Sequence, residues 1–551
     1  MVRRGILVVT ALSLAACGGA DTDLALDGSA DRALVADSVE AHMRRLAANE
    51  FMGRGPGHPG GDMAAEYIAD AFRAAGLAPV DGSYFQPVPM IGSTTASNAS
   101  LRFSGPDGSV DPTYLDDFVL NPGDPEATSV DGSAEVVFVG YGIDAPEANW
   151  NDFGGTDVAG KVLLVLVNDP PAPGDEPDLF GGRAMTYYGR WTYKYEEAAR
   201  QGALATLIVH ETEPAGYPWS VVRGGWSGEQ FALPPDPTGP APAGANGWVT
   251  EDVARQLLAL GGHDYDALKA SAADRGFQAV ATGVTASMEL EATSRVVETR
   301  NVVGLLEGSA RPDEIVTVTS HYDHFGVGET IDGDSIYNGA YDNASGTALL
   351  MELARALAGA DPLERSVLFI ATAAEEQGLL GAQWYVQSPL FPLSSTVAEV
   401  NVDGANLWGE TDDVTVQGEE RSELGAFVRP HARSLGLTIL PDQEPEKGFF
   451  FRSDHFPFAK AGVPSLYIEH GRSFRGQPAG WGQEILDRYT AERYHAPSDE
   501  FSEDFVFDGA VQQGELVIRT VRDIANAESW PAWHEGQEFK AARDAMMGSG
   551  G

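Results

Sequence analysis

The sequence predicts an α/β protein with a mixed, mostly parallel central sheet flanked by helices, into which a small β-rich unit is inserted. From about Thr299 onward, near-continuous apolar strands alternate with helical segments, which is typical of a sheet covered on both faces. Between residues 131 and 284, short β-type runs are instead broken by loops rich in proline and glycine. At 551 residues, the chain is also longer than one hydrophobic core usually organises, so we expect two units.

The first residues have the layout of an export signal. Arg3 and Arg4 precede an apolar run from Gly5 to Leu14, and small residues lead to Cys17, the only cysteine. The run is shorter than the roughly 20 apolar residues that a bilayer span needs. LAAC resembles the bacterial lipobox, which implies that Cys17 is lipidated; the alternative is an ordinary cleaved signal. We therefore expect export to the bacterial cell envelope, with a lipid anchor in the outer membrane facing the periplasm, or secretion.

The chain divides further by composition and periodicity. The segment after Cys17 is rich in small and acidic residues, which predicts a flexible tether. Apolar residues then recur at helical spacing from Ala33 to Ala48 and from Gly61 to Ala75, which predicts two helices. The expected division is signal 1–17, tether 18–32, first part of the larger domain 33–130, inserted unit 131–284, main part of the larger domain 285–535, and tail 536–551.

Charge and cysteine content exclude several classes of function. The chain has 81 Asp and Glu against 36 Lys and Arg, a formal net charge of −45. Phosphate backbones and anionic lipid surfaces would be repelled, so we expect no nucleic-acid partner and no membrane contact beyond the N-terminal anchor. One cysteine allows neither an internal disulfide nor a cysteine-based zinc site. Any bound metal must therefore use histidines and carboxylates.

Histidines and carboxylates follow the predicted strands of the second half of the chain. Ligands of open α/β sheets gather beyond the strand ends, and imidazole nitrogen and carboxylate oxygen are donors that zinc accepts. The pattern therefore indicates a metal site at one edge of the sheet. The residues are His321 and Asp323 in HYDH, Asp342 in DNASG, Glu375 and Glu376 in EEQG, Asp403 in VDG, and His495 in YHAPSD.

The adjacent pair Glu375 and Glu376 directly follows an apolar strand. Two like charges at a buried sheet edge would cost several kcal/mol without a compensating cation, which a metal supplies. One carboxylate could then bind the metal while the other accepts a proton from water. The alternative is an exposed pair that caps the helix from Gly378.

These motifs, in this order, resemble the co-catalytic di-zinc aminopeptidase family of metallopeptidases, family 28. The resemblance spans about Arg300 to Glu500, and the inserted unit resembles the protease-associated domain. It implies the zinc exopeptidase fold, two Zn²⁺ ions per chain, peptide substrates and hydrolytic release of N-terminal amino acids. By resemblance, His321, Asp342 and Asp403 hold one zinc. Asp342, Glu376 and His495 hold the other, so that Asp342 bridges the two ions.

The resemblance also implies roles beyond metal binding. Glu375 is the general base that deprotonates water and returns the proton to the leaving amine, and the Tyr494 hydroxyl helps to stabilise the oxyanion. Asp323 and Asp499 are expected to orient the two histidine ligands by accepting their second ring protons. Supporting roles are expected for residues that match family motifs without being ligands: His324, Ser453, Asp454 and His455.

Three alternatives stay open on the same scaffold. A carboxypeptidase would need cations for a free carboxylate, and Arg452, Arg472 and Arg475 are candidates. A glutaminyl cyclase works with one zinc, whereas the ligand set here favours two. An inactive binding homologue usually lacks ligands, and none of the five expected ligand positions is substituted. The oligomeric state and the side-chain preference are not predicted.

Overall fold

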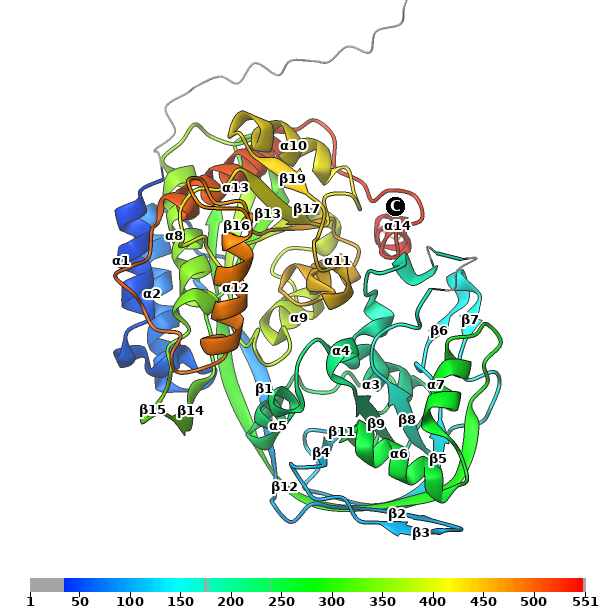
Figure 1. Cartoon of the computed structure of the whole chain (residues 1–551). Coiled ribbons are helices and arrows are strands. Elements are labelled where there is room, and N and C mark those ends of the chain that lie inside the picture. The colour runs from blue at the N-terminus through cyan, green and yellow to red at the C-terminus, as the bar shows by residue number, and fades with distance from the viewer. Residues whose placement is uncertain (1–33, 173–175, 178, 238, 549–551) are drawn as a thin grey trace, which may run out of the picture.

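The computed structural model describes residues 34–172, 176–177, 179–237 and 239–548, and Figure 1 shows them as two units side by side. The predicted export signal, the lipidation site Cys17 and the tether lie outside the described residues. In the part of the chain that is described, no helix combines the length and the apolar character needed to cross a bilayer.

The larger unit is built on the predicted mixed sheet. Strand β13 pairs in parallel with β16 and β17, and β17 pairs in parallel with β20, whereas β12 joins β16 antiparallel. The order is β19-β18-β20-β17-β13-β16-β12, and β1 adds to β12 antiparallel. The bounds are β1 (Phe85–Thr95), β12 (Val280–Leu306), β13 (Arg311–His321), β16 (Arg365–Thr372), β17 (Thr396–Asn401), β18 (Asp413–Gln417), β19 (Thr438–Leu440) and β20 (Ser465–Ile468).

Helices cover both faces of this sheet, as the continuous apolar strands predict. One face packs into the largest core cluster with α1 (Ala36–Leu46), α2 (Pro59–Ala75), α8 (Gly346–Ala358) and α13 (Asp508–Asn526). The other face packs on α9 (Leu380–Gln387) and α11 (His455–Lys460). Helix α1 lies within the first predicted helical stretch, and α2 covers the second one but begins two residues earlier, at Pro59. Also present are α10 (Leu424–Ser434) and α12 (Trp481–Glu492).

A buried arginine fastens the connection between α1 and α2 to the sheet. Arg54 is fully buried in the 3₁₀ turn Asn49–Arg54 and donates hydrogen bonds to the carbonyl oxygens of Tyr322 (2.6 Å), Leu46 (2.9 Å), Asn338 (2.6 Å) and Gly339 (2.8 Å). Burial lowers the pKa of Arg54 to about 10. Because Tyr322 and Gly339 belong to the segments that carry HYDH and DNASG, this arginine braces both.

The smaller unit has its own sheet and its own core. Its strands β5, β8, β9 and β11 run parallel, and β4 pairs antiparallel with β11. Strands β2, β3 and β4 belong to this sheet, although the sequence division places them in the larger domain, before residue 131. The bounds are β2 (Ser100–Gly105), β3 (Gly108–Val110), β4 (Phe118–Pro122), β5 (Ser129–Phe138), β8 (Val162–Leu166), β9 (Ala205–His210), β11 (Ala245–Thr250), α3 (Trp191–Arg200), α4 (Thr212–Ala215), α5 (Trp219–Ser227), α6 (Glu251–Leu260) and α7 (Tyr265–Ala272).

Strand β12 passes through both sheets. Its first half, from Val280 to Glu291, pairs with β5, and its last residues, from Val302 to Leu306, pair with β16. The long green strand in Figure 1 shows this path from one unit to the other. The two sheets are therefore joined by one uninterrupted strand.

The predicted tail, 536–551, contains a helix, α14 (Lys540–Gly548). Arg543 donates hydrogen bonds to the carbonyl oxygens of Leu393 (3.1 Å) and Thr396 (2.8 Å), and Phe539 is buried in an aromatic cluster. Buried side chains therefore hold the described part of this segment, up to residue 548, on the larger unit.

Candidate metal centre

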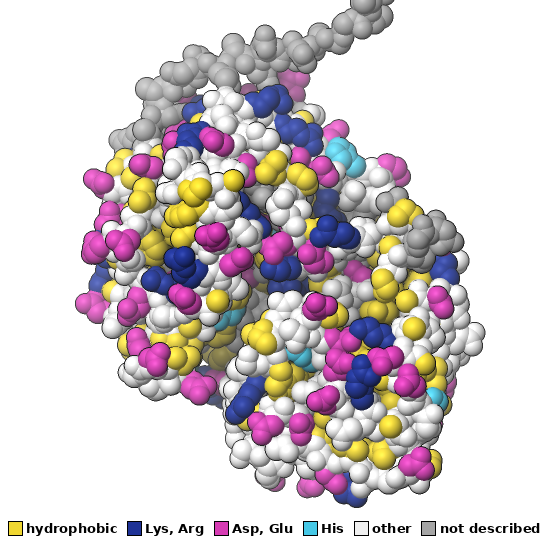
Figure 2. Space-filling model, in the orientation of Figure 1, with side chains coloured by type: hydrophobic (Ala, Val, Ile, Leu, Met, Phe, Trp, Pro, Cys, Tyr) yellow, Lys and Arg dark blue, Asp and Glu magenta, His cyan; other side chains and the backbone are white. Residues whose placement is uncertain are grey.

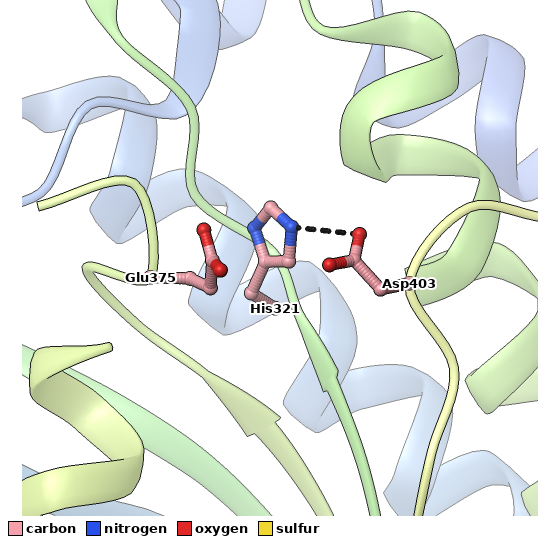
Figure 3. A group of neighbouring side chains, drawn as sticks. All are labelled: His321, Glu375 and Asp403. Carbon is pink, nitrogen blue, oxygen red and sulfur yellow. Dashed lines mark hydrogen bonds and ion pairs between the residues drawn. The ribbon is translucent and has the colours of Figure 1, made fainter. Parts of the chain in front are cut away.

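The histidines and carboxylates meet beyond the ends of three neighbouring strands. His321 is the last residue of β13, Glu375 lies shortly after β16, and Asp403 lies shortly after β17. Figure 3 shows the His321 ring between the other two side chains. His321 Nε2 is 3.2 Å from Asp403 Oδ1. The parallel strands thus bring together residues that are far apart in the sequence.

Asp342 lies between two histidines. Its Oδ1 is 3.4 Å from His321 Nε2, and its Oδ2 is 3.3 Å from His495 Nε2. His495 Nε2 is also 3.1 Å from Glu376 Oε2. The five residues expected to bind metal therefore form one continuous cluster, in which Asp342 occupies the centre.

The donor set fits a divalent metal such as zinc. One ligand atom each from His321, Glu375 and Asp403 lies within 4.8 Å of the others, and the same holds for His321, Asp342 and Glu376. Within the described residues, His321 Nδ1 and His495 Nε2 are buried without a hydrogen bond. Imidazole nitrogens and carboxylate oxygens are ordinary zinc ligands.

The electrostatics of the cluster also call for a cation. Burial and then the neighbouring Asp342 act to raise the pKa of Glu376, but His495 and His324 lower it to about 2. Burial acts to lower the pKa of His495, but Glu376 and Asp342 raise it to about 10. Carboxylates outnumber histidines here, and a bound dication would offset the excess negative charge that burial makes costly.

Glu375 differs from its neighbour. Burial raises the pKa of its carboxyl well above the usual range, and the nearby carboxylates Asp403 and Glu376 add to this against the effect of His321. Its backbone N–H donates to Asp323 Oδ1 at 3.1 Å. A carboxyl with a raised pKa is suited to accept and return a proton near neutral pH.

Tyr494 lies against one of the histidines of the cluster. The residue is 48% exposed, and its ring stacks on His495 with a centroid distance of 3.7 Å. The structure therefore places the Tyr494 ring beside the cluster.

The two carboxylates expected to orient the histidines behave differently. Asp323 Oδ1 is 3.7 Å from His321 Nδ1, which is longer than a hydrogen bond. Asp499 accepts the backbone N–H groups of Tyr341 and Asp342, each at 3.1 Å, and the Tyr489 hydroxyl at 3.1 Å. Among the described contacts, Asp499 therefore makes no bond to His495 and instead accepts the backbone amides of the Asp342 loop.

Two expected supporting residues contact the cluster directly. His324 Nδ1 is 2.5 Å from Glu376 Oε1, and Ser453 Oγ donates to Asp403 Oδ2 at 2.7 Å. These contacts leave fewer orientations open to the Glu376 and Asp403 carboxylates, as partners of metal ligands commonly do.

One residue that joins the loops of the site was not singled out from its sequence. Asn343 is fully buried, and its Oδ1 accepts the backbone N–H groups of Gly346 and Gly404, each at 2.9 Å. Its Nδ2 donates to the carbonyl oxygen of His321 at 3.2 Å. The available signal was its place directly after Asp342 in DNASG.

Comparisons with known proteins agree with this geometry. Residues 301–520 match the sequence model of peptidase family M28. The chain is 30% identical over 213 residues to a probable zinc metalloprotease of Leptosphaeria maculans, covering 33% of this chain and 49% of that protein. It is 27% identical over 251 residues to Aminopeptidase YwaD of Bacillus subtilis, covering 44% of this chain and 49% of that protein.

The chain thus spans about half the length of each of these two relatives. Among solved structures, the aminopeptidase from Aneurinibacillus sp. strain AM-1 superposes with a TM-score of 0.52 at 19% identity, covering 90% of this chain and 95% of that one. At this level of identity, the likeness shows a shared fold and nothing more.

Proposed function

Because residues 301–520 of this chain belong to peptidase family M28, we propose that the protein is a zinc-dependent metallopeptidase that releases N-terminal amino acids from peptides. The observation that carries the proposal is the central position of Asp342, with one carboxylate oxygen 3.4 Å from His321 and the other 3.3 Å from His495. A carboxylate so placed can bridge two ions.

Two zinc ions would be held by the five clustered residues. His321 and Asp403 would complete one site with Asp342, and Glu376 and His495 would complete the other. When bound, zinc acts as a Lewis acid and lowers the pKa of water from 15.7 to about 7. The contacts of His324 with Glu376 and of Ser453 with Asp403 support this division, because each holds a ligand carboxylate in place.

Glu375 would move the proton. Its buried carboxyl, with a raised pKa, takes a proton from the attacking water and returns it to the amine of the leaving residue. Tyr494, next to His495 and partly exposed, would donate its hydroxyl proton in a hydrogen bond to the oxyanion of the tetrahedral species. The two residues flank the cluster and need not bind metal.

The proposal is tested with purified protein, a leucyl anilide and an N-terminally blocked dipeptide. We expect hydrolysis of the anilide alone, loss of activity with a chelator, recovery on addition of zinc, and two equivalents of zinc per chain by metal analysis. Undiminished hydrolysis in excess chelator would exclude the metal mechanism. Preferential hydrolysis of the blocked dipeptide would favour a carboxypeptidase, and one equivalent of zinc with cyclisation of N-terminal glutamine would favour a cyclase.

Export and anchoring through Cys17 are proposed from the sequence of residues 1–17. Expression with a Cys17→Ala variant tests this, since a lipidated protein partitions into detergent and the variant should stay in the aqueous phase. Equal partitioning of both forms would exclude the anchor.

A further inference from the structure

A chain of buried polar side chains leads from the candidate metal centre into the sheet of the larger unit. Ser453 Oγ donates to Asp403 Oδ2 at 2.7 Å, and Asn401 Nδ2 donates to Ser453 Oγ at 2.7 Å. Thr319 Oγ1 lies 2.8 Å from Asn401 Oδ1 and 2.6 Å from Glu399 Oε1. These contacts connect Asp403 with Glu399 without a gap.

The strands place these side chains on one face of the sheet. Glu399 and Asn401 lie two positions apart on β17, so their side chains point to the same side. Thr319 lies on the neighbouring strand β13, in register with Asn401. All three side chains are fully buried, and Ser453 is 2% exposed. The chain must therefore satisfy its hydrogen-bonding groups from within.

The protons of this chain can be counted. Ser453 gives its proton to Asp403, so Asn401 presents Nδ2 to Ser453 and Oδ1 to Thr319. Asn401 Oδ1 carries no hydrogen, so the single proton of the Thr319 hydroxyl goes to it. The contact between Thr319 Oγ1 and Glu399 Oε1 is then a hydrogen bond only if Glu399 is the donor. The geometry thus requires a protonated Glu399.

The surroundings of Glu399 also favour the neutral acid. Figure 2 shows acidic side chains spread over the visible face of the molecule, where water solvates them, whereas Glu399 is fully buried. Its Oε2 has no hydrogen-bond partner among the described residues, and a negative charge on such an oxygen is costly. Burial raises the pKa of Glu399 well above its usual range against the effect of the Thr319 hydroxyl, and the buried acid Asp454 adds to the rise.

We propose that Glu399 is a neutral acid whose proton sets the direction of this chain, and that the chain positions Asp403 as an ionised metal ligand. The inference deepens the proposed function and rests on it, because Asp403 would hold one of the zinc ions. An ionised Glu399 would take the Thr319 proton and leave Asn401 Oδ1 without a donor. Glu399 is therefore a positioning residue, which acts on the ligand from inside the sheet and touches neither metal nor substrate.

Infrared spectroscopy of the metal-free protein tests the proton. Glutamate labelled with carbon-13 at its side-chain carboxyl separates the Glu signals from those of Asp454 and the other Asp residues. Subtraction of the spectrum of Glu399→Gln then isolates one side chain. At neutral pH, we expect the wild type to show the C=O stretch of a neutral carboxyl that the variant lacks. The bands of an ionised carboxylate in this difference spectrum would overturn the proposal.

Competition with a chelator of known zinc affinity tests the positioning. Thr319→Val interrupts the chain with a side chain of nearly the same shape, so we expect zinc affinity to fall about tenfold or more. Glu399→Gln should stay within about twofold of the wild type, because its neutral amide can donate in place of the acid. Thr317→Val is the matched control, since it removes a buried hydroxyl on the same strand that has no hydrogen bond, and should leave the affinity unchanged.

Two results of this competition would contradict the positioning role. Equal zinc affinities in Thr319→Val and Thr317→Val, with the fold retained by circular dichroism, would mean that the chain does not hold Asp403. A loss in Glu399→Gln as large as that in Thr319→Val would mean that Glu399 acts as an anion. Wild type that binds no zinc would contradict the proposed function, whereas the infrared spectrum of the metal-free protein would still decide whether Glu399 carries the proton.

Discussion

Asp499 accepts the backbone N–H of Asp342 at 3.1 Å. The same carboxylate accepts the N–H of Tyr341 at 3.1 Å and the Tyr489 hydroxyl at 3.1 Å. The segment after His495 therefore holds the loop that carries the central carboxylate of the cluster. Asp499 acts on that carboxylate through the backbone, and its removal should move Asp342 relative to the two histidines.

We predict that Asp499→Ala lowers zinc affinity by about 10- to 100-fold, as loss of a group that positions metal ligands typically does. Competition with a chelator of known affinity measures this. Asp504→Ala, at an exposed position nearby in the chain, is the control and should bind zinc as the wild type does. Unchanged affinity in Asp499→Ala, with the fold retained by circular dichroism, would mean that the Asp342 loop holds its place without this carboxylate.

The adjacent glutamates should separate metal binding from turnover. Glu376→Ala removes a carboxylate that lies 3.1 Å from His495, so we expect it to lose zinc and activity together. Glu375→Ala should keep zinc and lower kcat by about 10²- to 10⁴-fold, the usual contribution of a general base. The test measures the zinc content of both variants and their turnover of a leucyl anilide. Equal zinc loss in both variants would contradict the division of roles.

Arg54→Met should destabilise the protein by at least about 3 kcal/mol, because four buried carbonyl oxygens would lose a charged donor. Urea unfolding measures the free energy of unfolding. The control is Arg102→Met, which removes an exposed ion pair with Asp111 and should change stability by less than about 1 kcal/mol. A loss below about 1 kcal/mol in Arg54→Met would show that the carbonyl groups find other donors.

His455 should make the protein sensitive to mild acid. Burial lowers the pKa of this histidine to about 3, below the value of about 6.5 expected in the unfolded chain. As the pH falls below 6.5, the unfolded chain gains a proton that the folded protein excludes, so stability is lost. The loss amounts to up to about 2 kcal/mol between pH 6.5 and 5.

His455→Gln, which cannot ionise, should flatten this part of the pH dependence even if its stability at pH 7.5 is lower. Urea unfolding of both proteins across the range provides the comparison. The exposed His534→Gln serves as the control and should follow the wild type. Parallel curves for wild type and His455→Gln would assign the acid sensitivity to other groups.

The sheet of the larger unit could be predicted because each of its buried strands appears in the sequence as a run of apolar residues. Strand β13 is buried over most of its length and ends at His321, so its apolar run marked both the strand and the polar residue beyond it. Parallel strands then force such ends to one edge, which is why motifs far apart in the sequence could be placed together.

Contacts through the backbone could not be predicted in this way. The bonds from the Tyr341 and Asp342 amides to Asp499 use backbone N–H groups. Nearly every residue has such a group, so the residue types in the sequence do not indicate these bonds. The contact between the two units could not be predicted either, because it depends on how the smaller unit docks. That docking is set by contacts such as Tyr187 with Phe456, which are formed between segments far apart in the sequence.

The boundaries of the smaller unit could not be predicted from the sequence either, and strand β12 explains why. Residues in its first half alternate between buried and exposed, whereas Asn301 to Gly304 are buried without alternation. The sequence therefore shows two different patterns, and only the structure shows that a single strand carries both.

A shared strand also has a consequence for unfolding. Residues 280–291 of β12 pair with β5, and residues 302–306 of the same strand pair with β16. We therefore expect that unfolding of one unit disturbs the strand on which the other unit depends. Calorimetry should accordingly record one cooperative transition rather than two, and proteolysis is not expected to release either half as an intact fragment.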